Sequence, residues 1–288
     1  MGGICVITIV ACGESGIKSM ENLNIHRYWD SNRIAIHLDK IMNIENGCDK
    51  NIYLGDCIEK LLNSKGRMEI SYHNEGVIQG RLAKYFINTE IAIVVGIIKD
   101  ERDTTLIEAT CKLLSKMGIL NLLMVSKEYN NDHLQDIIYK TSIKYLSESC
   151  SSIFEVEREK FEDNVIQLSN NFYELINFNG IFNLNVGDFY KIFRGGKNSY
   201  FAYATACGKD RGKKVVEEIL SNKDMVRKLM LAENILINIT GNKSLGLHEI
   251  KNITELIYEN INEDAGIVFG TLINDKYVED IKLSLIVN

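Results

Sequence analysis

Proline is absent from the 288 residues of the chain, although about 5% is usual in proteins. Glycine, asparagine and aspartate must therefore make the turns. Paired cysteines are absent too, because the seven cysteines include no CxxC spacing. An odd number of cysteines without such pairs argues against a disulfide framework and against a zinc site. We expect reduced thiols, as in a cytoplasmic protein.

The chain also has no excess of basic residues and no long apolar run. Its 33 Lys and Arg against 39 Asp and Glu give a formal net charge of -6, which does not favour direct nucleic-acid binding. The longest apolar runs, 91–98 and 119–125, are strand-sized, whereas a membrane span needs about 18 residues. No basic segment precedes an apolar one at the N-terminus, so no signal peptide is expected. These absences predict a cytoplasmic protein with no membrane segment.

Strand-like and helix-like segments alternate through the first half of the chain. Runs rich in β-branched residues predict strands that are buried on both faces, and helical spacing of apolar residues lies between several of them. This order predicts a doubly wound α/β domain with a parallel sheet. The predicted strands are 4–10, 33–38, 91–98, 119–125 and 152–156.

Two glycines, Gly13 and Gly16, follow the first predicted strand, ahead of a helix expected from about Ile17. A strand, a glycine turn and a helix can hold phosphate, but the same residues also suit a plain tight turn. Asp39 ends the second strand, where an acid can contact a ribose or simply start a turn.

A further helix is expected after strand 91–98. Asp103 or Thr104 is a suitable N-cap for it, and Thr105 with Glu108 suits a capping box. Helical spacing also predicts a helix at 131–146.

A long amphipathic helix lies past the middle of the chain. Val165, Leu168, Phe172 and Leu175 recur at helical spacing, and Gly180 offers a C-terminal stop. A polar turn at 183–188 follows it. Beyond the turn, two helices, 213–220 and 248–261, and strands at 200–205, 235–239, 267–272 and 281–287 predict a smaller α+β layer.

Several strings in this order resemble the tubulin/FtsZ superfamily, specifically FtsZ. Residues 235–241, ILINITG, are similar to the family's VLVNITGG, and residues 204–211, ATACGKDR, resemble its GxASGEDR. Further likenesses to the family lie at 117–127, 180–188, 265–271 and 281–287. The resemblance implies a Rossmann-like GTPase-type domain at 1–158, a central helix and inter-subunit loop at 159–194, and an α+β domain at 195–288.

The chain departs from the family where the family binds phosphate. The family has a GGGTGTG loop after the strand that corresponds to 91–98, whereas residues 99–105 here read KDERDTT. Carboxylates repel phosphate, and side chains block the close approach of backbone that glycine permits. Glu14 also enters the first glycine loop. The positions that the resemblance assigns to nucleotide are Gly13, Gly16, Asp39, Gly96, Thr104 and Thr105.

The loop after the central helix resembles the family's catalytic insert, which reaches the nucleotide of the next subunit. The family pattern is Asn-x-Asp-x-x-Asp. Asn183 matches it, Asn185 replaces the first acid, and Asp188 matches the second. Equally, Asp188 could be the N-cap of the following helix, with Asn183 and Asn185 as ordinary turn residues.

Three functions are compatible with these residues. The first is an FtsZ-like protein with a degenerate nucleotide site and no cofactor, a non-hydrolysing filament, scaffold or assembly regulator that associates head to tail with itself or with another FtsZ-like subunit. The alternative is an active GTPase that polymerises in cell division or DNA segregation. It would bind GTP or GDP with Mg and use Gly13, Gly16, Asp39 and Lys99 or Arg102 on the phosphates. The third is an unrelated α/β enzyme, for which Cys12 at a helix N-terminus would need a lowered pKa.

Overall fold

The computed structural model describes residues 6–21, 32–38, 48–54, 80, 82–128, 133–177, 184–193, 197–275, 277 and 280–288. The chain forms two compact units. The first comprises residues 1–166 and 195–197, and the second comprises residues 167–194 and 198–288. Each unit is described by itself.

The first unit is built on a sheet of order β3-β2-β1-β4-β5-β6-β7. The pairings from β3 to β6 are parallel, as the alternating sequence pattern predicts. Because Cys12 at the end of β1 lies beside Ile36 of β2 and Gly96 of β4, the carboxyl ends of these strands meet at one edge. The strands are β1 (Val6–Cys12), β2 (Asn32–His37), β3 (Lys50–Tyr53), β4 (Thr89–Ile98), β5 (Leu120–Lys127), β6 (Ser152–Glu155) and β7 (Lys197–Asn198).

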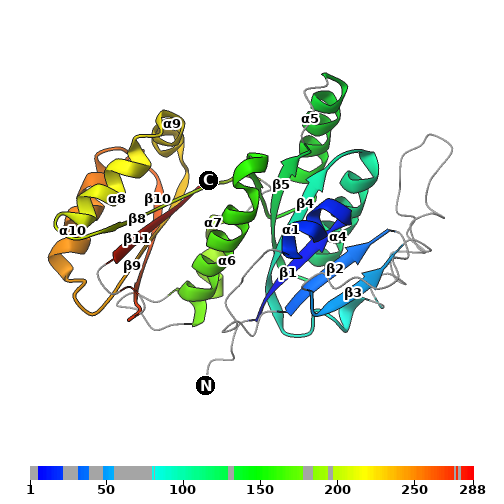
Figure 1. The fold of residues 1–288 in the computed structure, drawn as a ribbon, viewed down its shortest axis with the longest axis horizontal. Helices are drawn as coiled ribbons and strands as arrows, with labels where there is room; N and C mark the ends of the chain where they lie inside the picture. The colour runs from blue at the N-terminus through cyan, green and yellow to red at the C-terminus, as the bar shows by residue number, and fades with distance from the viewer. Residues whose placement is uncertain are drawn as a thin grey trace. The chain divides into compact units, whose positions relative to one another are not determined.

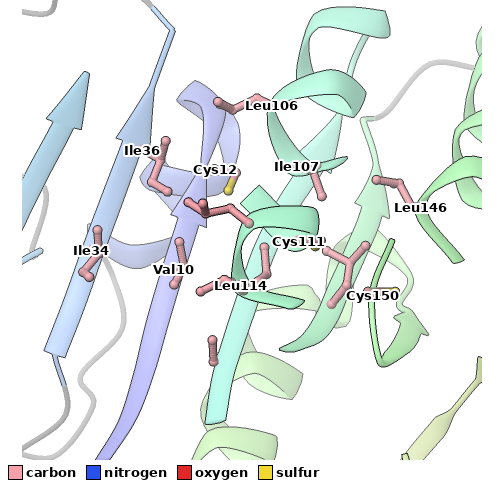
Figure 2. Packing of buried hydrophobic residues seen from close by; sticks show 14 of the residues in the cluster. Val10, Cys12, Ile34, Ile36, Leu106, Ile107, Cys111, Leu114, Leu146 and Cys150 are labelled. Atoms are coloured by element: carbon pink, nitrogen blue, oxygen red, sulfur yellow. The ribbon is translucent and has the colours of Figure 1, made fainter. Parts of the chain in front are cut away.

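Helices α1 (Gly13–Glu21) and α4 (Glu101–Lys116) lie beside this sheet, followed along the chain by α5 (His133–Ser147) (Figure 1). In Figure 2, Val10 of β1 lies next to Leu114 of α4, and Ile36 of β2 belongs to the same buried cluster. These side chains are fully buried, so they form the core that holds α4 on the sheet.

Helices α1 and α4 both begin earlier in the chain than the sequence predicts. Helix α1 begins at Gly13, directly after β1, and not near Ile17. Helix α4 begins at Glu101 with Asp100 as its N-cap, so the expected caps Asp103 and Thr104 are wrong. Asp100 has an extended backbone, and its carboxylate reaches two amides of the first turn. The helix therefore starts as soon as β4 ends.

The predicted central helix is confirmed as α6 (Phe161–Asn177), which follows a short 3-10 turn, η2 (Arg158–Lys160). The predicted face of Val165, Leu168, Phe172 and Leu175 is buried. The Phe172 ring packs at 5.2 Å, centroid to centroid, on a ring of the next helix, α7 (Val186–Ile192). The predicted stop at Gly180 lies outside the described residues.

The second unit carries a mixed sheet of order β10-β9-β11-β8. Strands β9 and β10 are parallel, and β11 is antiparallel to both β8 and β9. One face of this sheet packs in a core with its helices (Figure 1). The elements are β8 (Tyr200–Cys207), α8 (Arg211–Leu220), α9 (Lys223–Leu231), β9 (Asn234–Gly241), α10 (Leu247–Tyr258), β10 (Gly266–Ile273) and β11 (Asp280–Val287).

The prediction of two helices in the layer at 195–288 is wrong, because its described residues form α9 as well as α8 and α10. Its signal in the sequence is weak, since only Met225 and Leu229 of its residues are buried. Asn222 starts the helix by accepting hydrogen bonds from two backbone amides. Among the described residues, no helix is both long enough and apolar enough to cross a membrane.

Candidate functional site

A cleft of about 170 Å³ lies where β1, β2 and β4 end. The strand order places β2 on one side of β1 and β4 on the other. Ligands of doubly wound sheets usually bind at such a switch point, at the carboxyl ends of the strands. The cleft is lined by Gly13, Glu14, His37, Leu38, Lys99, Asp100, Arg102 and Asp103.

Two carboxylates of the cleft are bonded to the backbone at the start of α4. Asp100 Oδ1 accepts hydrogen bonds from the amides of Arg102, at 2.7 Å, and Asp103, at 3.3 Å. Asp103 Oδ2 accepts one from the Lys99 amide at 3.0 Å. The first amides of a helix have no partner within the helix and form a natural anion site. Here, three amides around this helix start are bonded to the chain's own acids.

Gly13 brings the first loop against one of these acids. Its φ of +73° is a left-handed conformation that suits glycine. A Cβ added to Gly13 would lie 2.7 Å from Asp103 Oδ1, so the carboxylate rests on the glycine backbone. Burial raises the pKa of Asp103, and the hydrogen bond from the Lys99 amide opposes that rise. Asp103 therefore closes the gap between the turn after β1 and the start of α4.

Further side chains join the same loops. Ser15 donates a hydrogen bond to Glu128 at the end of β5, at 3.1 Å, and Lys99 Nζ lies 4.0 Å from the same carboxylate. Glu14 is exposed and pairs with Lys18, which lowers the pKa of Glu14. The cleft thus holds mixed charges, with three acids and two bases among its lining residues.

The predicted site glycines Gly16 and Gly96 lie side by side and are not among the residues that line the cleft. A Cβ on Gly16 would lie 2.9 Å from the Val95 carbonyl oxygen and 3.3 Å from the Gly96 Cα. A Cβ on Gly96 would meet Ile107 of α4 at 2.4 Å. Both glycines therefore let α1 and α4 approach β4 closely.

The predicted threonines do not line the cleft. Thr104 is buried, and its hydroxyl lies 2.7 Å from the Ser142 hydroxyl of α5. Thr105 donates to the Glu101 carbonyl within its own helix. Asp39 and Asn183 lie outside the described residues. His37, which the sequence did not single out, lines the cleft, and its Nε2 lies 2.8 Å from Asn51 Oδ1.

The loop ahead of α7 forms a capping box. Asn185 is the N-cap and accepts from the Asp188 amide at 3.2 Å, while Asp188 accepts from the Asn185 amide at 3.1 Å. Asp188 also pairs with Lys191 at 3.2 Å. The expectation that Asp188 is itself the N-cap is therefore wrong, because it is the third residue of the helix. A role of this loop toward another subunit stays a prediction.

Two remaining chemistries find little support. Burial raises the pKa of the Cys12 thiol to about 12. A nucleophilic cysteine needs a lowered pKa, so the hypothesis that Cys12 is one is wrong. Within the described part of the chain, no three acidic, histidine or cysteine side chains could together hold a metal ion.

Comparison with known proteins bears on both units. Residues 199–288 match the model of the FtsZ family, C-terminal domain. A solved mutant of FtsZ from M. jannaschii is 17% identical, with a TM-score of 0.78 over 99% of this chain and 91% of that one. An empty FtsZ dimer from M. jannaschii is 16% identical, with a TM-score of 0.78 over 98% and 87%.

CetZ from Methanosaeta thermophila strain DSM 6194 is also similar, at 14% identity and a TM-score of 0.70 over 97% of this chain and 85% of that one. At such identities, a structural likeness establishes the fold. The predicted architecture, a parallel-sheet domain, a central helix and a smaller α+β layer, is confirmed.

Proposed function

We propose that this chain, which has the tubulin/FtsZ fold and a C-terminal domain that matches the FtsZ family, is an FtsZ-like cytoskeletal subunit. We further propose that its cleft does not hold GTP. Its subunits assemble in the cytoplasm, head to tail, with one another or with another FtsZ-like subunit. It acts as a filament, scaffold or assembly regulator without hydrolysing GTP. The observation that carries this proposal is that Asp100 and Asp103 accept hydrogen bonds from two amides of α4, those of Arg102 and Asp103, and from the Lys99 amide ahead of the helix.

Charge supports the exclusion of phosphate. A phosphate oxygen about 4 Å from a carboxylate costs about 4 kcal/mol per pair of unit charges at an effective dielectric constant of about 20. Glu14, Asp100 and Asp103 line the cleft, against the cations Lys99 and Arg102. Lys99 also lies near Glu128, so its attraction for a phosphate is reduced. These residues do not suit the phosphates of GTP.

Head-to-tail assembly is supported by the kind of protein to which the chain is similar. One of the similar structures is a dimer of FtsZ from M. jannaschii. In this chain, the loop that ends in the capping box of Asn185 and Asp188 is proposed as a contact surface between subunits. We assign it no catalytic step, because the cleft that it would face does not suit a nucleotide.

Calorimetric titration of the purified protein with GTP and GDP, with Mg present, tests the proposal. We expect no binding at micromolar nucleotide, and no nucleotide in the mass spectrum of the protein as purified. Sedimentation and electron microscopy should find assembly that does not depend on nucleotide. Micromolar binding with Mg-dependent release of phosphate would refute the proposal.

An active GTPase is the second candidate, and one observation favours it. Lys99 and Arg102 both line the cleft, and cations can replace lost amides at a phosphate site. Pelleting assays separate the two candidates. Filaments that form only with GTP, and disassemble as phosphate is released, would support the GTPase.

A further inference from the structure

We propose that Asp100 and Asp103 are internal substitutes for a phosphate group, and that they decide which ligands the cleft rejects. Their carboxylates bond to the amides that a bound phosphate would need. The inference rests on the proposed function, because it gives the reason why the cleft holds no nucleotide. It adds that the amide cradle itself is intact beneath these two side chains.

The geometry of the bonds carries this inference. A phosphate at a helix start presents several oxygens to backbone amides. Asp100 Oδ1 takes the amides of Arg102 and Asp103, and Asp103 Oδ2 takes that of Lys99. Two carboxylates therefore supply, from opposite ends of the first turn, the acceptors that one oxyanion would supply.

Asp103 also makes the contact that a ligand would make between two loops. Its Oδ2 is bonded to the Lys99 amide after β4, while its Oδ1 rests on Gly13 after β1. These loops are 90 residues apart in the chain but end on neighbouring strands. A phosphate bound between them would displace the Asp103 carboxylate from both.

Competition from inside the chain is hard to overcome. Because the carboxylates are tethered to the helix that they cap, a free anion must compete with partners that are always in place. It must also enter against their negative charge. Removing both carboxylates should therefore create an anion site without adding any new group.

The experiment compares wild type with the double variant Asp100→Gly, Asp103→Ala. Glycine has no side-chain acceptor but is tolerated at an N-cap, and alanine suits the helix interior. Inorganic pyrophosphate is the probe, titrated by calorimetry. We expect the double variant to bind it at least tenfold more tightly than wild type. In amide NMR spectra, the signals of Lys99, Arg102 and position 103 should shift with pyrophosphate only in the variant.

A matched control removes two other acids of the same helix, Glu101→Gln with Glu108→Gln. Neither residue lines the cleft, and the change in net charge is the same. Equal gains in pyrophosphate binding by the variant and the control would overturn the inference, because net charge alone would then explain them. Wild type that binds pyrophosphate as well as the double variant does would overturn it too.

The single variant Asp103→Ala frees the Lys99 amide, keeps the Asp100 cap, and guards against misfolding of the double variant. It should bind pyrophosphate more tightly than wild type and keep the circular dichroism spectrum of wild type. A folded variant with no gain would overturn the inference. That result would leave the proposed function standing, since the proposed function fails only if wild type binds GTP.

Discussion

Replacing Gly16 by alanine tests whether this glycine serves packing or phosphate. The new Cβ would lie 2.9 Å from the Val95 carbonyl oxygen and 3.3 Å from the Gly96 Cα. Both atoms belong to the backbone of β4, which is paired on both sides, with β1 and β5. The strand cannot yield, so α1 must move away from the sheet, although its Ile17 is buried.

Overpacking of this kind costs about 1–3 kcal/mol, and alanine returns up to about 1 kcal/mol through its better helix propensity. We therefore expect a net loss of about 1–2 kcal/mol, which lowers the melting temperature of a unit of this size by roughly 2–8 °C. Urea denaturation followed by far-UV circular dichroism measures the loss.

Gly80→Ala is the matched control in the same unit. Gly80 is exposed, and a Cβ there would meet nothing within 4 Å, so we expect no loss of stability. If Gly16→Ala is as stable as this control, α1 does not lie as close to β4 as the structure has it. If Gly16→Ala instead keeps its stability and loses GTP binding that wild type possesses, the glycine serves phosphate and the packing argument is refuted.

Two further predictions concern the second unit. Arg211 donates hydrogen bonds to both carboxylate oxygens of Glu249, at 2.8 and 2.9 Å, and is nearly buried. Arg211→Ala should therefore destabilise the unit by about 2–3 kcal/mol, a value between those for exposed and buried ion pairs. Urea denaturation measures this loss, and a variant within 0.5 kcal/mol or so of wild type, the range of ordinary surface changes, would contradict it. Asp188→Ala should remove the capping box with Asn185, costing about 1 kcal/mol, and should weaken head-to-tail association in sedimentation velocity. Wild-type association by a folded Asp188→Ala variant would remove this loop from the proposed contact.

The strands and long helices could be predicted because the spacing of apolar residues along the sequence indicates which of their faces are buried. The run 91–98 is apolar throughout, and β4 is buried along nearly its whole length. Helix α9 could not be found in this way, because only two of its side chains are buried. Its start depends on the Asn222 side chain, which accepts hydrogen bonds from the Asp224 and Met225 amides. These hydrogen bonds form only when the chain after α8 turns. A short helix with few buried residues is set more by its cap than by its pattern.

The caps themselves were predicted less well than the helices. Several residues ahead of or within α4 have side chains that can cap a helix. The sequence predicted Asp103 or Thr104 as the N-cap, whereas Asp100 is the N-cap. The choice depends on where β4 ends, since a helix can begin as soon as the strand no longer pairs. Asp103 was then left free to bond backward to the Lys99 amide. A shift of three residues in a helix start thus changed the role of two acids.

The roles of the glycines could not be predicted, because two different demands exclude a Cβ in the same way. Close approach to a phosphate and close approach to a neighbouring element both require glycine. Gly13 faces the cleft, whereas Gly16 and Gly96 meet packed backbone and the Ile107 side chain. Only the contacts of α1, β4 and α4 separate these cases, and two of them join residues far apart in the chain, Gly13 with Asp103 and Gly16 with Gly96.

The acids at the start of α4 follow from the cost of leaving amides without partners. Losing an N-cap acceptor costs about 0.5–2 kcal/mol of helix stability, so a helix start with neither a phosphate nor a capping acid would be less stable by about that amount. Asp100 and Asp103 provide acceptors for three of these amides. On the proposed function, the loss of the ligand and the gain of the acids are two parts of one change. Acids placed elsewhere in the same loop would repel phosphate equally well, yet would leave the amides unbonded. The positions of Asp100 and Asp103, more than the number of acids, therefore support the proposal that this helix start holds no nucleotide.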